Sequence, residues 1–257
     1  MGISLSCSSC KSIDDKMNDN IFFPPMSTLN EIEQFYRQDD KHIFLNSSNN
    51  TKISVYISKP LKNVTKYIVW AHGNAMCIAH IIPYLQNIQN NLNVGFVAFD
   101  YQGYGCSEGL PSEQNCYDDI KTVITYINEQ LNINLDDIYL IGGSLGTGVI
   151  VDYAYNNNWK NPLIIISPYK TIAKVVFDSS IVRPIDKFRS EAKIPYLTCP
   201  VRIIHGAQDK LINIDHGKHL YSLLQNKNLK PIWIDDADHN NIYWHIQIDD
   251  IAEVLNY

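Results

Sequence analysis

The stretch IYLIGGSLGTG, residues 138–148, decides the fold. A short apolar run ends in the pattern G-x-S-x-G, and apolar residues then continue at helical spacing. A strand that turns directly into a helix presents the central serine, Ser144, at the tip of a very tight turn, and Gly142 and Gly146 flank it because a side chain there would meet neighbouring backbone. The N-terminal N–H groups of the helix favour developing negative charge. The pattern predicts a nucleophilic serine; a glycine-rich turn without chemistry is the plainer alternative.

The rest of the chain alternates between apolar runs typical of buried strands and segments with helical periodicity. We expect strands at residues 42–45, 52–58, 67–71, 94–100, 138–141, 163–166, 201–205 and 231–235. We expect helices at about residues 80–91, 112–131, 145–155 and 217–225, and a closing helix from about 246. This order predicts an α/β protein with a mostly parallel central sheet and helices on both faces. Ligands on such a sheet bind at the carboxyl ends of the strands.

Two further strand ends carry residues that could activate the serine. Asp209 follows the strand at 201–205, and His239 follows the strand at 231–235. Alone, Asp209 could cap a turn and His239 could be a surface side chain. Together with Ser144 they give the chain order serine, acid, histidine, which is that of an α/β-hydrolase triad. His239 would then remove the serine proton, and Asp209 would orient the imidazole.

Acyl transfer also needs two N–H donors for the oxyanion. The backbone N–H of Leu145 comes with the turn at Ser144, and we expect the second from Asn74, in the loop after the strand at 67–71. We expect no metal and no cofactor, because no H-E-x-x-H pattern or pair of C-x-x-C motifs supports metal binding. The histidines considered were His72, His80, His205 and His239.

Composition narrows the class of protein. The chain has 257 residues, of which 45% are hydrophobic and 19% charged, and a formal charge of -6 without clustered Lys and Arg. This argues against a nucleic-acid partner. No window is apolar enough for a transmembrane helix, and no secretory signal is present. We therefore expect reduced thiols on the cytosolic side for all six cysteines. These are Cys7, Cys10, Cys77, Cys106, Cys116 and Cys199, and we expect Cys77 to be a small core residue.

The first ten residues, MGISLSCSSC, match the pattern for N-myristoylation, with Gly2 as the acceptor after removal of Met1. One myristoyl chain binds a bilayer only marginally, so stable anchoring needs a second signal. S-palmitoylation of Cys7 and Cys10 would supply it. We expect residues 1–20 to be a disordered lipid-anchor segment at the cytosolic face of the plasma membrane or an endomembrane, and 21–257 to be the hydrolase domain. An unmodified tail is the alternative.

Several stretches together carry a family resemblance. The chain resembles the α/β-hydrolase superfamily from about residue 40 onward, and more narrowly the α/β-hydrolase domain-containing protein 17 subfamily of membrane-anchored protein depalmitoylases. The matching stretches are FFPP (22–25), AHGNA (71–75), FDYQGYGCSEGLPSEQN (99–115), GGSLGT (142–147), SP (167–168), IHGAQD (204–209) and ADHNN (237–241). The chain departs from the subfamily at Asp238, where glycine is usual, and in having only two N-terminal cysteines instead of a dense cluster.

The resemblance implies the triad Ser144, Asp209 and His239, and hydrolysis of the thioesters of S-acylated cysteines through an acyl-serine. The substrates would be S-acylated proteins or other acyl esters. Two alternatives stay open: an esterase or lipase acting on small esters or glycerolipids, and a non-catalytic interaction protein on the same scaffold. About thirty residues separate Pro168 from Pro200, too few for a large lid domain, so we expect a minimal cap. Tyr169 and residues 175–177 could form a short lid or ordinary core.

Overall fold

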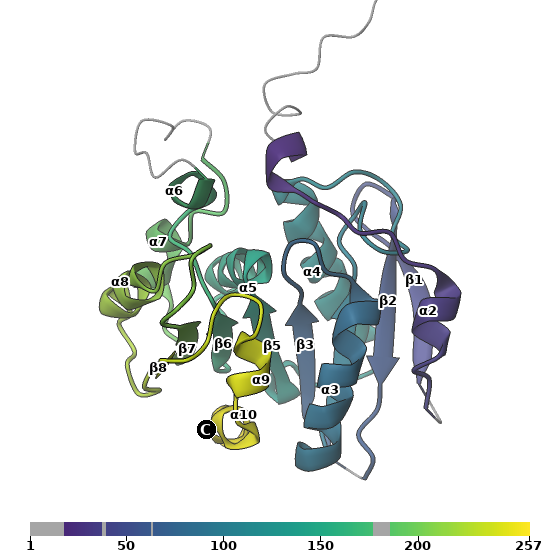
Figure 1. Ribbon diagram of the computed structural model, residues 1–257. Helices are drawn as coiled ribbons and strands as arrows, with labels where there is room; N and C mark the ends of the chain where they lie inside the picture. The colour runs from purple at the N-terminus through teal and green to yellow at the C-terminus, as the bar shows by residue number, and fades with distance from the viewer. Residues whose placement is uncertain (1–17, 38–39, 63, 177–185) are drawn as a thin grey trace, which may run out of the picture.

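The computed structural model describes residues 18–37, 40–62, 64–176 and 186–257. Its centre is an eight-stranded sheet with the strand order β1-β2-β4-β3-β5-β6-β7-β8 (Figure 1). The strands are β1 (Lys41–Asn46), β2 (Lys52–Ser58), β3 (Tyr67–Ala71), β4 (Gly95–Phe99), β5 (Ile138–Gly143), β6 (Leu163–Ile166), β7 (Val201–Gly206) and β8 (Ile232–Ile234). From β4 to β8 all neighbours are parallel, while β2 pairs antiparallel with both β4 and β1. The predicted mostly parallel sheet is confirmed.

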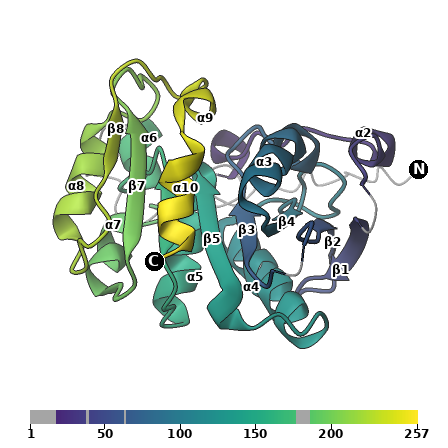
Figure 2. The same ribbon diagram turned by 90° about the horizontal axis from the view of Figure 1, so that it is seen from below.

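Helices cover both faces of this sheet (Figures 1 and 2). They are α2 (Leu29–Glu33), α3 (Ile78–Leu92), α4 (Glu113–Glu129), α5 (Leu145–Asn156), α6 (Ile172–Val176), α7 (Ser190–Lys193), α8 (Asp215–Leu223), α9 (Ile242–His245) and α10 (Ile248–Leu255), with 3-10 turns η1 (Leu135–Asp137) and η3 (Ile194–Tyr196). The apolar sides of α4, α5 and α8 form one core with the sheet. Those of α3 and α10 form the other. Both faces of the central strands are therefore buried, as their unbroken apolar runs predict.

Helix α5 packs directly against the sheet, with glycine at two positions of its first turn, Gly146 and Gly148. Ten of its twelve residues are buried. A Cβ atom on Gly146 would lie 2.0 Å from the carbonyl oxygen of Ala71 in β3. This close approach brings the start of α5 to the carboxyl edge of the sheet, beside the ends of β3 and β6.

The C-terminal region differs from expectation. We expected one closing helix, but the chain forms α9 and α10, separated where Ile246 adopts an extended backbone with φ -68° and ψ 121°. Helix α8 begins at Asp215 instead of residue 217, because the side chain of Asn213 accepts a hydrogen bond from the Asp215 N–H at 2.9 Å. Such side-chain bonds start a helix without changing its apolar periodicity.

At the N-terminus, residues 18–21 form a helical turn in which the Phe22 N–H donates to the Asn18 carbonyl at 2.9 Å. We expected unstructured chain up to residue 20. The predicted lipid sites Gly2, Cys7 and Cys10 lie outside the described residues. Within the part of the chain that the structure describes, no helix has the length and apolarity needed to span a bilayer. Between β6 and β7, the residues that the structure describes form the short helices α6 and α7 and the turn η3, as expected for a minimal cap.

Candidate active site

Ser144 occupies a strained turn between β5 and α5. Its φ of 47° and ψ of -115° lie in a region that L-residues rarely adopt. The backbone N–H of Ser144 donates to the carbonyl of Ile166 in β6 at 2.9 Å, which pins the turn to the neighbouring strand. A Cβ on Gly142 would lie 2.5 Å from the Gly146 carbonyl oxygen. Glycine is therefore required at both flanking positions, as the pattern predicts.

The three residues predicted at separate strand ends meet in one hydrogen-bonded row. His239 Nε2 lies 3.1 Å from Ser144 Oγ, and His239 Nδ1 lies 2.7 Å from Asp209 Oδ2. Because the carboxylate can only accept, Nδ1 carries the proton and Nε2 can accept from the serine hydroxyl. This is the arrangement that lets a histidine remove a proton from a serine.

Asp209 is held in place from three sides. Its Oδ1 accepts hydrogen bonds from the backbone N–H groups of Leu211 at 2.9 Å and Ile212 at 2.7 Å. Burial opposes ionisation, but contacts from His205, His239 and the Ile212 N–H outweigh it, so the pKa of Asp209 lies below its usual 3.8. The carboxylate stays ionised at neutral pH.

His205 contacts Asp209, a role that the sequence does not predict. Its Nε2 donates to the Ile212 carbonyl at 2.8 Å and lies 3.5 Å from Asp209 Oδ2. The side chain is fully buried at the end of β7. The sequence signal for this contact is the position of His205, which lies four residues before Asp209 at the end of β7. His205 thus steadies the loop that carries Asp209.

Asp238, the departure next to the predicted base, shapes the turn that carries His239. Its Oδ1 accepts hydrogen bonds from the N–H groups of Asn240 and Asn241 at 2.8 and 2.9 Å. The hydrogen bonds from these two backbone groups lower the pKa of Asp238. The Asp238 N–H in turn donates to Asn241 Oδ1 at 2.8 Å. The Asp238 carboxylate therefore stabilises the turn that carries His239.

Leu145 and Asn74, the predicted oxyanion donors, both line the space beside Ser144. The Asn74 side chain points to other partners. Its Oδ1 accepts from the Phe23 N–H at 2.9 Å and from the Tyr104 hydroxyl at 2.7 Å, and its Nδ2 donates to the Ile21 carbonyl at 2.6 Å. Only its backbone N–H is therefore suited to the predicted role.

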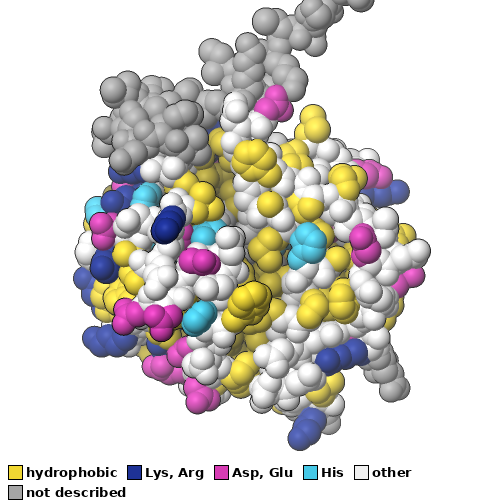
Figure 3. Space-filling model, in the orientation of Figure 1, with side chains coloured by type: hydrophobic (Ala, Val, Ile, Leu, Met, Phe, Trp, Pro, Cys, Tyr) yellow, Lys and Arg dark blue, Asp and Glu magenta, His cyan; other side chains and the backbone are white. Residues whose placement is uncertain are grey.

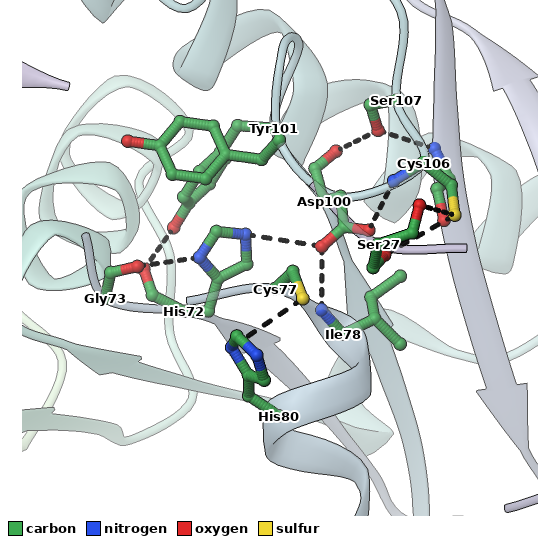
Figure 4. Close-up of polar contacts among 12 residues, drawn as sticks. Ser27, His72, Gly73, Cys77, Ile78, His80, Asp100, Tyr101, Cys106 and Ser107 are labelled. Carbon is green, nitrogen blue, oxygen red and sulfur yellow. Dashed lines mark hydrogen bonds and ion pairs between the residues drawn. The ribbon is translucent and has the colours of Figure 1, made fainter. Parts of the chain in front are cut away.

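A cluster of buried polar side chains contacts the loop after β3 that carries Asn74 (Figure 4). The Tyr101 hydroxyl donates to the His72 carbonyl at 2.8 Å, and His72 Nδ1 donates to the Gly73 carbonyl at 2.8 Å. Asp100 Oδ1 accepts a hydrogen bond from the Ile78 N–H at 2.7 Å, at the start of α3. Burial lowers the pKa of His72 to about 4 and raises that of Asp100 to about 7.

Cys77 lies at the edge of this cluster (Figure 4). Its side chain is buried, with Sγ 3.7 Å from His80 Nδ1. Burial raises the pKa of the Cys77 thiol above its usual value. A thiol of this kind is a weak nucleophile at neutral pH, in keeping with a core residue. Among the residues that the structure describes, no His, Cys, Asp and Glu side chains form a group that could hold a metal ion.

Two cavities border Ser144 and His239. The first, of about 320 Å³, is lined by Asn20, Ile21, Phe23, Asn74, Ala75, Ser144, Leu145, Tyr169, Ile172, Val175, Leu211, Ile212, His239 and Asn240. Figure 3 shows apolar side chains gathered along the groove between the α6 side and the α3 side of the molecule. The second, of about 350 Å³, shares five of these residues and adds Gly73, Met76, His80, Ile166, Ser167, Ile242 and Tyr243. A substrate bound at Ser144 thus has space on two sides.

Known proteins with similar sequences share this fold. Residues 67–180 match the family described as alpha/beta hydrolase fold. Over 261 aligned residues the chain is 42% identical to L404 of Acanthamoeba polyphaga mimivirus, which carries an α/β-hydrolase name; the alignment covers 100% of this chain and 99% of L404. Human α/β-hydrolase domain-containing protein 17B is 29% identical, over 76% of this chain and 68% of its own length. Aho-3 of Caenorhabditis elegans is 31% identical, over 76% and 58%.

Solved structures agree on the architecture. The esterase Pf2001 of Pyrococcus furiosus superposes with a TM-score of 0.74 at 16% identity, covering 91% of this chain and 98% of that one. XC6422 of Xanthomonas campestris, described as an α/β serine hydrolase without lid, superposes with a TM-score of 0.61 at 17% identity, over 86% and 94%. The chain therefore belongs to the α/β-hydrolase family, and its sequence resembles that of α/β-hydrolase domain-containing protein 17.

Proposed function

We propose that this hydrolase uses Ser144 as its nucleophile and cleaves acyl thioesters of S-acylated proteins. The observation that carries the proposal is the hydrogen-bonded row of Ser144, His239 and Asp209 at the floor of an apolar cavity. A serine without a base is a poor nucleophile, and this row supplies the base and its orienting acid.

In the proposed reaction, His239 Nε2 takes the proton as Ser144 Oγ attacks the acyl carbonyl carbon. The N–H groups of Leu145 and Asn74 stabilise the oxyanion. The carbon–sulfur bond then breaks, and His239 returns the proton to the departing cysteine thiolate. This leaves an acyl-serine. Water, activated by the same histidine, attacks that ester and releases the fatty acid and free Ser144.

The proposed substrate class rests on the shape of the site. The cavity of about 320 Å³ is walled by aliphatic and aromatic side chains, including Leu145, Ile172, Val175 and Leu211. Such a wall suits a hydrocarbon chain. The cavity on the other side of Ser144 leaves space for a leaving group. The resemblance to α/β-hydrolase domain-containing protein 17 supports a cysteine thiolate as that leaving group.

The alternative is an esterase or lipase that cleaves oxygen esters, since the same apolar cavity suits the acyl part of either substrate. The deciding experiment compares hydrolysis of a palmitoyl-cysteine peptide with its palmitoyl-serine analogue. Ser144→Ala is measured beside Ser48→Ala, which removes the hydroxyl of an exposed serine that lines neither cavity. We expect faster cleavage of the thioester, loss of at least about 10³-fold in Ser144→Ala, and no change in Ser48→Ala.

Preference for the oxygen ester would replace the thioesterase proposal with the esterase one. Activity that survives in Ser144→Ala would remove the serine mechanism. No hydrolysis by the wild type on thioesters, small esters or glycerolipids would favour the non-catalytic scaffold.

We also propose that Gly2, Cys7 and Cys10 carry lipids that hold the enzyme at the cytosolic face of a membrane. The sequence pattern supports this. An enzyme anchored there would share its surface with S-acylated substrates.

A further inference from the structure

Residues 21–27, called the strap below, run from above α4 to α2 at the carboxyl edge of the sheet (Figure 1). Ile21 and Phe23 line the apolar cavity beside Ser144. Phe22, between them, does not line this cavity. It is buried, and its ring lies 6.1 Å from that of Phe188, edge to face. Alternate side chains of the strap thus anchor it and wall the cavity.

Asn74 fastens this wall to the loop that carries the predicted oxyanion donor. Its carboxamide bonds the strap twice, at the Phe23 N–H and the Ile21 carbonyl. Tyr104 holds the same carboxamide at 2.7 Å. One side chain therefore joins three segments: its own loop, the strap and the loop that carries Tyr104.

The far half of the strap is paired with the loop after β4. The Gly105 N–H donates to the Pro25 carbonyl at 2.8 Å, and the Ser27 N–H donates to the Gly105 carbonyl at 3.3 Å. Gly105 has φ +54°, and a Cβ there would lie 2.1 Å from an Asp100 carboxylate oxygen. The GYG run at 103–105 thus supports the strap.

We propose that the strap selects the acyl chain: Phe23 and Ile21 contact the distal part of a long chain, and Asn74 is the positioning residue that keeps this wall in register with Ser144. This rests on the proposed hydrolase function. A short acyl group stays near Ser144, at the floor of the cavity. A long chain extends along the wall to Phe23, whose side chain is 59% exposed and therefore forms the rim.

The test uses the full-length chain and thioester peptides carrying acetyl, octanoyl or palmitoyl groups. Phe23→Ala is compared with Met26→Ala, which truncates a strap side chain that is 80% exposed and does not line the cavity. We expect Phe23→Ala to lower kcat/KM for the palmitoyl peptide by about tenfold relative to the acetyl peptide. The Met26→Ala profile should match the wild type.

Asn74→Ala keeps the backbone N–H but releases both bonds to the strap. We expect the palmitoyl-to-acetyl ratio of kcat/KM to fall as in Phe23→Ala. Because both changes act on one wall, the double variant should lose little more than the larger single loss. A residue that only stabilises the fold would lower the midpoint of unfolding and leave this ratio unchanged.

A palmitoyl-to-acetyl ratio in Phe23→Ala equal to or above that of the wild type would overturn the assignment of the strap, while leaving the hydrolase intact. A wild type that cleaves none of the three peptides would instead overturn the proposed function, and the strap assignment with it.

Discussion

At the scale of single residues, the buried pair of His72 and Asp100 links stability to pH. Their side chains are 1% and 0% exposed, and His72 Nε2 lies 3.7 Å from Asp100 Oδ1. Burial lowers the pKa of His72 to about 4 and raises that of Asp100 to about 7. Between these values the folded pair is neutral, with one proton on the carboxyl group.

This pairing predicts how stability depends on pH. The lowered pKa of His72 costs stability as the pH falls from 6.5 toward 4. The raised pKa of Asp100 costs stability as the pH rises from 3.8 toward 7. Between pH 4 and 6.5 folded and unfolded chains each hold one proton on the pair, so the two slopes cancel.

Asp100→Asn should reveal the pH dependence of stability that comes from His72 alone. Asparagine resembles the neutral carboxyl group and keeps an oxygen for the Ile78 N–H. We expect the free energy of unfolding of the variant to fall by about 3 kcal/mol relative to the wild type between pH 6.5 and pH 4. Urea unfolding at several pH values measures this. Parallel curves for the two proteins would show that His72 is charged in the folded state.

At the scale of elements, the packing of α5 against β3 places Ser144. Gly146 makes it possible, because a Cβ atom there would lie 2.0 Å from the Ala71 carbonyl oxygen and 2.9 Å from that of His72. Both obstacles are backbone atoms of the central strand and the loop after it. A side chain at this position would push the helix off the sheet and move the serine turn with it.

Gly146→Ala should therefore destabilise the fold by about 3 kcal/mol, the upper part of the range for overpacked cores. Gly143→Ala is the matched control, because its Cβ would meet a side-chain atom, the hydroxyl of Tyr243 at 2.1 Å, instead of backbone. We expect a smaller loss there. Urea unfolding of both variants at pH 7 compares them, and equal losses would contradict a backbone obstacle at Gly146.

At the scale of the whole molecule, the candidate site is assembled at one edge of the sheet from segments far apart in the chain. Five parts of the chain meet there: the strap, the loop at residues 72–75, Ser144, Asp209 and His239. The proposed anchor is joined to the strap by a short connection. Ten residues from Cys10 to Asn20 span at most about 35 Å, so a lipid-anchored chain would hold the cavity close to the bilayer.

Loss of the anchor should change where the protein is found without changing its rate of hydrolysis. We expect Gly2→Ala, and Cys7→Ser combined with Cys10→Ser, each to move most of the protein from the membrane to the soluble fraction, because one lipid signal binds only marginally. Hydrolysis of a soluble acyl peptide should stay within about twofold, since a soluble substrate does not need the bilayer. Membrane retention by both variants would contradict the acylation hypothesis.

Much of the sheet could be read from the chain. The strands at 67–71 and 163–166 match the predicted bounds, because buried parallel strands are unbroken apolar runs. The antiparallel strand at 52–58 matches its predicted bounds as well. The division of the last helix into α9 and α10 was missed, since the apolar spacing continues across it. His205 was considered only as a metal ligand, and nothing local shows that its ring reaches Asp209.

The sequence by itself determined the class of fold and the three residues that form the row at the strand ends. These follow from short-range patterns: a glycine beside a serine, an apolar run, a polar residue just after it. Only the tertiary structure decided that these residues meet, that Asn74 binds the strap with its side chain, and that Ile21 and Phe23 complete the cavity. The physical reason is that a cavity wall is made by contacts between distant segments, as between Ile21 and Asn74, which are 53 residues apart. Such contacts leave no periodicity in the chain.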